Sequence, residues 1–62
     1  MRTFTTEEKL KCAEREVGFR KRVYERRVAD GRMSRQKADD EISAMQAIAD
    51  DYRQKAAGER LL

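Results

Sequence analysis

The chain has 62 residues, of which 44% are charged, and a formal net charge of +3. A chain this short forms at most one domain and buries too little surface to stabilise a monomer comfortably, so disulfides, a metal or self-association are the usual remedies. One cysteine, Cys12, and the lack of histidine exclude an internal disulfide and a zinc site built by one chain. We therefore expect that self-association stabilises the folded chain.

The composition favours long helices. Proline is absent and there are only three glycines, whereas Ala, Glu, Lys, Arg and Gln are common. The low mean hydropathy also suits a disordered chain, but the periodic apolar residues indicate amphipathic helices that need a partner surface. No apolar run approaches the ~20 residues of a membrane span, and residues 1–6 lack the apolar core of a signal peptide. We therefore expect a cytoplasmic protein without membrane contact.

A first helix is predicted at about residues 6–29. Thr5 and Glu8 have the spacing of a capping box, in which each side chain satisfies a free amide at the helix start. Gly18 costs ~1 kcal/mol in a helix interior, and it either lets another helix approach closely or is simply tolerated. Apolar residues at steps of three, four and seven form one stripe, made of Leu10, Ala13, Val17, Tyr24 and Val28.

A turn at about residues 30–34 separates this helix from a second one at about residues 35–57. Gly31 can adopt the left-handed conformation that commonly ends a helix, and Ser34 is a favourable N-cap for the next. Gly58 is expected to end the second helix. The apolar stripe of that helix is made of Ala38, Ile42, Met45, Ala49, Tyr52 and Ala56.

Folding the chain about this turn gives an all-α, antiparallel two-helix hairpin. Positions whose numbers sum to about 66 then face each other, so that Val17 meets Ala49, a pairing of large with small that suits close packing. One continuous helix would carry Asp30 and Gly31 in its interior, at a cost of ~1–2 kcal/mol in propensity.

The hairpin leaves apolar side chains partly exposed, and we expect two copies to cover them by forming a homodimeric four-helix bundle. A marginal monomer is the alternative. The expected dimer interface includes Phe19, Val23, Ile48 and Tyr52.

Positive charge is concentrated around the turn. Residues 20–37 hold eight basic side chains and only two acidic ones. A charge run is most often a solvated face, and basic residues also complement the dipole at the end of a helix. Five arginines between positions 20 and 32 exceed that need, and arginine suits phosphates and carboxylates. The candidate residues for binding a partner or nucleic acid are Arg20, Lys21, Arg22, Arg26, Arg27, Arg32 and Arg35.

No catalytic, metal-binding or nucleotide-binding motif is present, so we expect a protein that is not an enzyme and uses no cofactor. Asp50 and Asp51 are adjacent in sequence, so on a helix their side chains point in different directions and do not form an acid–base pair. Cys12 has basic neighbours but lacks the His or Asn partner of a protease-like nucleophile.

Three functions stay open, in decreasing order of preference. The first is a helical protein-interaction module. The second is a nucleic-acid-binding protein whose arginines contact phosphates, weakly specific and salt-sensitive, although helix-turn-helix spacing is absent and aromatic residues are few. The third is a structural element that holds a larger assembly together.

The chain also resembles a group of very small helical proteins carried by bacteriophages and prophages of proteobacteria. The resemblance lies in Glu14-Arg15-Glu16-Val17, in Arg20-Lys21-Arg22-Val23-Tyr24, and in the stretch from Val28-Ala29-Asp30-Gly31-Arg32-Met33-Ser34 through Asp50-Asp51-Tyr52-Arg53. The group supplies no functional residues to carry over. It implies a context, since phage accessory proteins often bind a host or phage protein, and this would place the chain in the cytoplasm of a bacterial host cell.

Overall fold

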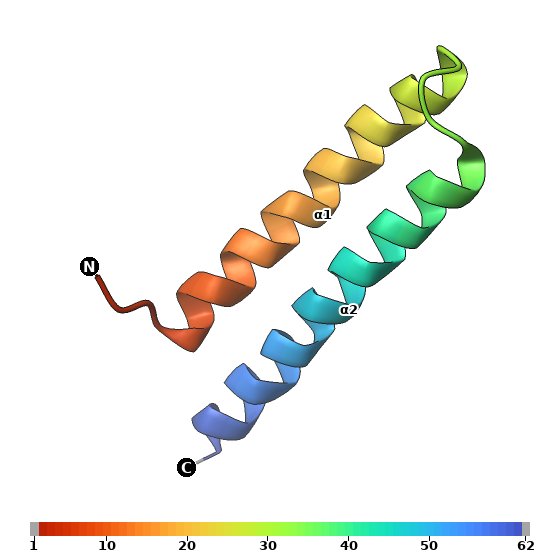
Figure 1. Ribbon diagram of the computed structural model, residues 1–62. Helices are drawn as coiled ribbons and strands as arrows, with labels where there is room; N and C mark the ends of the chain where they lie inside the picture. Colours follow the sequence, from red (N-terminus) through yellow and green to blue (C-terminus); the bar gives the residue numbers. More distant parts are fainter. Residues whose placement is uncertain (1, 62) are drawn as a thin grey trace.

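Two antiparallel helices lie side by side in the computed structural model, which describes residues 2–61 (Figure 1). Helix α1 spans Thr6–Ala29 and helix α2 spans Arg35–Arg60. No strand occurs within residues 2–61, and neither helix is long and apolar enough to cross a membrane. The backbone forms a rod of about 47 × 24 × 15 Å, with the turn at one end and both chain ends at the other. The predicted all-α helical hairpin is thus present.

Helix α1 begins at the predicted capping box. The backbone N–H of Glu8 donates to Oγ1 of Thr5 at 3.1 Å, and the backbone N–H of Thr5 donates to Oε1 of Glu8 at 3.0 Å. Both amides would otherwise lack an intrahelical acceptor. Glu7 and Glu8 also lie in the first turn of α1, where the helix dipole favours negative charge. Local sequence therefore specifies where α1 starts.

In the turn, a glycine ends α1 and a serine caps the start of α2. Gly31 has φ +74°. Its N–H donates to the carbonyl of Val28 at 3.0 Å, and the N–H of Arg32 donates to the carbonyl of Arg27 at 2.8 Å, which together make a Schellman motif. Ser34 then caps α2, because its Oγ accepts from the N–H of Lys37 at 3.0 Å.

The core between the helices is narrow and rich in alanine. Ala38 and Ala49 have no exposed surface, and no large side chain among residues 2–61 is fully buried. Val17 packs with Ala49, as the predicted register requires, and Met45 lies against the same cluster. The small residues of α2 thus let the helices approach closely. The buried residues are Leu10, Ala13, Val17, Ala38, Ala49 and Ala56.

Polar contacts across the hairpin agree with the predicted register. Oγ1 of Thr6 donates to Oε1 of Glu59 at 2.8 Å, and Nη2 of Arg53 donates to Oε2 of Glu14 at 2.8 Å. The residue numbers in these pairs sum to 65 and 67, close to the expected 66.

Helix α2 is longer than expected at its C-terminal end. It continues through Gly58 to Arg60 instead of stopping at residue 57. Gly58 does not have a positive φ, which Gly31 alone has among residues 2–61. The last turn is held against α1, because Glu59 accepts from Thr6 and Arg60 pairs with Glu7. These contacts tie the residues after Gly58 to α1, although glycine disfavours a helix by ~1 kcal/mol.

Gly18 is not a point of close helix approach. A Cβ atom built on it would contact only Nη1 of Arg22, at 3.7 Å, which is an ordinary van der Waals distance. Within the hairpin, Gly18 therefore fits the second of the two predicted interpretations, a glycine that is tolerated in a long helix.

Gly18→Ala should consequently stabilise the protein. The methyl group has space, and alanine loses less backbone entropy than glycine in a helix, so we expect the free energy of unfolding to rise by about 0.5–1 kcal/mol. Urea unfolding followed by circular dichroism measures this change. A decrease in stability would show that the site is closer to another surface than the structure indicates.

Gly31→Val should destabilise the hairpin, because a β-branched residue disfavours the left-handed conformation by about 1–2 kcal/mol. The matched control is Gly31→Asn, which tolerates that conformation better and should lose less stability. Thermal unfolding of both variants at one protein concentration gives the comparison. Equal losses in the two variants would contradict the assigned role of Gly31.

Candidate functional site

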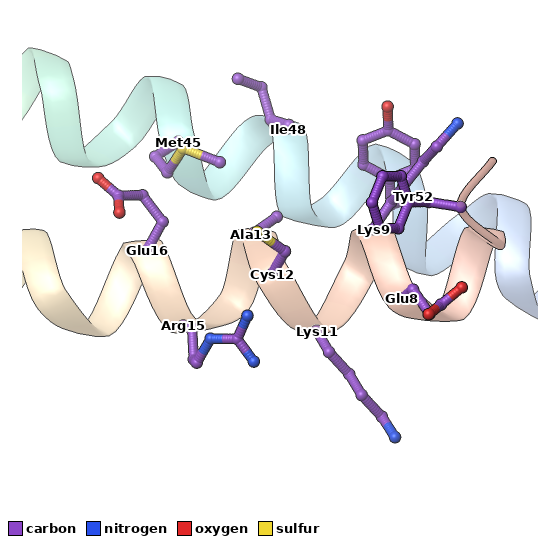
Figure 2. Close-up of a pocket in the computed structure, with 11 residues that line it drawn as sticks. Glu8, Lys9, Lys11, Cys12, Ala13, Arg15, Glu16, Met45, Ile48 and Tyr52 are labelled. Carbon is purple, nitrogen blue, oxygen red and sulfur yellow. The ribbon is translucent and has the colours of Figure 1, made fainter. Parts of the chain in front are cut away.

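An open groove of about 630 Å³ lies along one side of the hairpin. Its lining comes from both helices and from the segment that precedes α1. Figure 2 shows Met45 and Ile48 on α2 above Cys12 and Ala13 on α1, with Tyr52 at the end of the groove nearer the chain ends. The groove is lined mainly by apolar atoms, so it is suited to binding an apolar surface rather than to holding a charged ligand.

The opposite side of the hairpin is polar. A smaller depression of about 170 Å³ lies there, lined by residues that include Glu14 and Arg53. Arg53 joins Glu14 on α1 to Asp50 on α2, with N–O distances of 2.8 and 2.6 Å. Gln46 donates to the same Asp50 carboxylate at 3.0 Å. Arg53 therefore bridges the two helices on this side of the hairpin.

The structure brings only two of the four predicted interface residues into the groove. Ile48, which is 45% exposed, and Tyr52 line it. Phe19, which is 47% exposed, and Val23, which is half-buried, are not among the lining residues. Their predicted role in a dimer interface is not tested by the hairpin alone.

Sequence reasoning did not assign Phe4, Cys12 and Met45 to this surface. Met45 was placed in the stripe between the helices, and it does contact the core, but it also lines the groove. Phe4 precedes α1 and is 50% exposed. Cys12 and Met45 lie on the same side of the contact between the two helices. This shared position follows from the pairing of the helices and is not visible in the sequence of either helix alone.

Among the predicted basic binding residues, Arg20 is held within the chain. Its guanidinium donates to Oε1 of Glu16 at 2.9 Å and to the backbone carbonyl of Glu41 at 2.9 Å. Its side chain is only 22% exposed. The hydrogen bond to Glu16 is the main cause that raises the pKa of Arg20. Arg20 therefore joins α1 to α2 and has few donors left for an external phosphate.

Arg35 is also engaged, at the start of α2. It makes a two-point contact with Glu25 on α1, with N–O distances of 2.6 and 3.1 Å, and it lies 3.8 Å from Asp39. The hydrogen bond to Arg35 lowers the pKa of Glu25, and the same contact raises the pKa of Arg35. This pair ties the two helices together next to the turn.

The other five predicted basic residues are exposed and form no ion pair with the carboxylates of residues 2–61. The guanidinium of Arg27 lies over the ring of Tyr24, 5.4 Å from its centroid. A binding role for this set stays a prediction. Its members are Lys21, Arg22, Arg26, Arg27 and Arg32.

Residues 2–61 contain no group of three His, Cys, Asp or Glu side chains placed to hold a metal ion. The same part of the chain has no buried polar or charged residue. Cys12 is an exposed free thiol.

Comparison of the chain with protein-family models, with curated proteins and with solved structures finds no match. The resemblance to small phage-encoded helical proteins thus stays a prediction.

Acid should weaken the start of α1. Hydrogen bonding from the Thr5 backbone is the main cause that lowers the pKa of Glu8 from its usual 4.5. A carboxyl group whose pKa is lowered on folding adds stability above its unfolded pKa and loses that contribution as pH falls below it. We therefore expect the melting temperature to fall from pH 5 to about pH 3.

Glu8→Gln tests whether ionisation of Glu8 causes this acid sensitivity, because glutamine at the same position keeps the capping box but does not ionise. The variant should lose less melting temperature on acidification than the parent chain does. Asp51→Asn removes one exposed carboxyl group that is outside the ion pairs of residues 2–61 and serves as the control. Parallel acid profiles for Glu8→Gln and the parent would contradict the assignment.

Proposed function

We propose that this protein is a small, non-enzymatic helical interaction module that pairs with a second copy of itself through the groove. The result would be a four-helix bundle. The observation that carries the proposal is the apolar groove of about 630 Å³ that runs across both helices. Helices of bundles pack such faces together, and the cores of bundles are built from them.

The thin core supports this pairing. Four of the six buried residues are alanines, whereas the larger Ile48 in the groove is 45% exposed. Apolar burial contributes ~25 cal/mol per Å², so a seam of alanines contributes little to the stability of a 62-residue chain. Covering Met45, Ile48 and Tyr52 with a second groove would add the missing apolar contact.

Charge at the groove favours a second copy over an arbitrary apolar partner. Both signs of charge occur in its lining, where Glu8 and Glu16 are acidic and Lys9, Lys11 and Arg15 are basic. In a twofold dimer the same patch meets itself, so an acidic group of one copy can face a basic group of its mate. An antiparallel arrangement would also place the two basic turns at opposite ends of the bundle, far beyond the ~8 Å over which charges interact at physiological salt.

Such a bundle leaves the outer faces of the helices accessible to a further protein. The resemblance to phage accessory proteins suggests a host or phage protein for that role, in the cytoplasm of a bacterial cell.

Sedimentation equilibrium tests the pairing. The parent chain should be a dimer at micromolar concentrations, and Ile48→Lys should weaken the dimer by about tenfold or more, because it places a charge in an apolar interface. Ala47→Lys is the matched control, because it adds the same charge at the exposed neighbouring position, which does not line the groove. It should leave the association unchanged.

A stable parent monomer at high micromolar concentration would refute the bundle. Equal weakening by Ala47→Lys and Ile48→Lys would instead show that association does not use the groove. Circular dichroism of each variant at high concentration confirms that the helices are retained.

A further inference from the structure

The outer face of α1 carries a line of basic side chains, which includes Arg22 and Arg26 of the candidate binding residues and extends toward the N-terminal end of the helix. Four cations and one aromatic residue follow one another at steps of four, four, three and four residues, which places them on one helix face. All five are exposed, and the buried residues of α1, such as Leu10 and Val17, lie on the face toward α2. At 1.5 Å per residue the line is ~22 Å long. This basic stripe consists of Lys11, Arg15, Phe19, Arg22 and Arg26.

The charge of the basic stripe is not neutralised within the hairpin. Its four cations form no ion pair with the carboxylates of residues 2–61. Every acidic residue of α1 is already paired with an arginine outside the stripe. These acidic residues are Glu7, Glu8, Glu14, Glu16 and Glu25. A row of cations with no local counter-charge is suited to a ligand with a row of negative charges.

Phe19 lies at the centre of the basic stripe with 47% of its surface exposed. It follows Arg15 by four residues and precedes Arg22 by three, so cations flank it on both sides. An exposed aromatic ring between arginines is unfavourable in water but useful against a ligand that combines phosphates with flat or methylated bases.

We propose that the basic stripe binds duplex DNA, with α1 lying in the major groove and the four cations contacting phosphates. A helix with its side chains is ~10–12 Å across and the major groove of B-DNA is ~12 Å wide. Three of the four cations are arginines, whose planar fork matches phosphate oxygens. The deep, narrow major groove of duplex RNA does not admit a helix, so DNA is the duplex that fits.

This binding surface and the proposed dimer are compatible. Arg22 and Arg26 do not line the groove. Lys11 and Arg15 are among its lining residues, and Figure 2 shows the side chain of Lys11 directed away from α2. Two copies paired through the groove would therefore present two basic stripes. The DNA-binding proposal does not depend on the dimer, because each chain carries a complete stripe.

Fluorescence anisotropy measures the binding. The probes are a labelled random-sequence DNA duplex of 20 base pairs, the corresponding single strand, a duplex RNA and labelled poly-glutamate, between about 50 and 200 mM NaCl. We expect the DNA duplex to bind best. With four phosphate contacts at about 0.9 each, the slope of log K against log salt should be near −3 to −4, so affinity should fall about a hundredfold over that range.

Arg15→Gln combined with Arg22→Gln should reduce the magnitude of this slope by about two, since each lost phosphate contact contributes about one. The matched control is Lys37→Gln combined with Lys55→Gln. It removes the same charge from exposed positions on α2, outside the basic stripe, and it should keep the slope. Phe19→Ala should lower duplex affinity without changing the slope, because it removes an uncharged contact.

Three results would overturn the proposal. The first is no binding to duplex DNA at the lowest salt. The second is an equal change of slope in the two double variants, which would mean that only overall charge matters. The third is equal or tighter binding of poly-glutamate, single-stranded DNA or duplex RNA, which would assign the basic stripe to an acidic protein or to a nucleic acid without a readable major groove.

Discussion

The close approach of the helices along a seam of alanines is the constraint on which the rest of the structure depends. Ala49 has no exposed surface and packs on Val17, and the other buried residues of α2 are also alanines. Because the seam is thin, side chains at its edges can reach across it, as Arg53 does to Glu14 and Arg20 does to the carbonyl of Glu41. The same thinness leaves larger apolar side chains beside the seam and not within it.

The hairpin consequently has surfaces of different character. One side is bridged by ion pairs, and the other is the apolar groove with Met45 and Ile48 in its lining. The outer face of α1 adds a third surface, positive along its length, because the acidic residues of α1 are all paired with arginines elsewhere. The groove and this basic face share Lys11 and Arg15, whereas Arg22 and Arg26 lie outside the groove lining.

Sequence reasoning was strongest where structure is decided within a few residues. Thr5 with Glu8, Gly31 and Ser34 each act through hydrogen bonds to amides or carbonyls close in the chain, so their spacing alone indicates the helix ends. It was weaker at Gly58, where local propensity favours an end but contacts with Thr6 and Glu7, 53 residues away, hold the last turn in place.

The sequence by itself determined two helices, the turn and the register of the hairpin, because apolar periodicity and capping are local patterns. Only the tertiary structure decided which basic side chains are already paired with carboxylates and which remain without an ion pair within residues 2–61. Arg20 and Arg35 look like Arg22 and Arg26 in the sequence, but their carboxylate partners on the facing helix are 10 to 21 residues away, and pairing depends on which face each helix turns to the other. The groove likewise exists only once Cys12 and Met45 are brought to the same side of two packed helices.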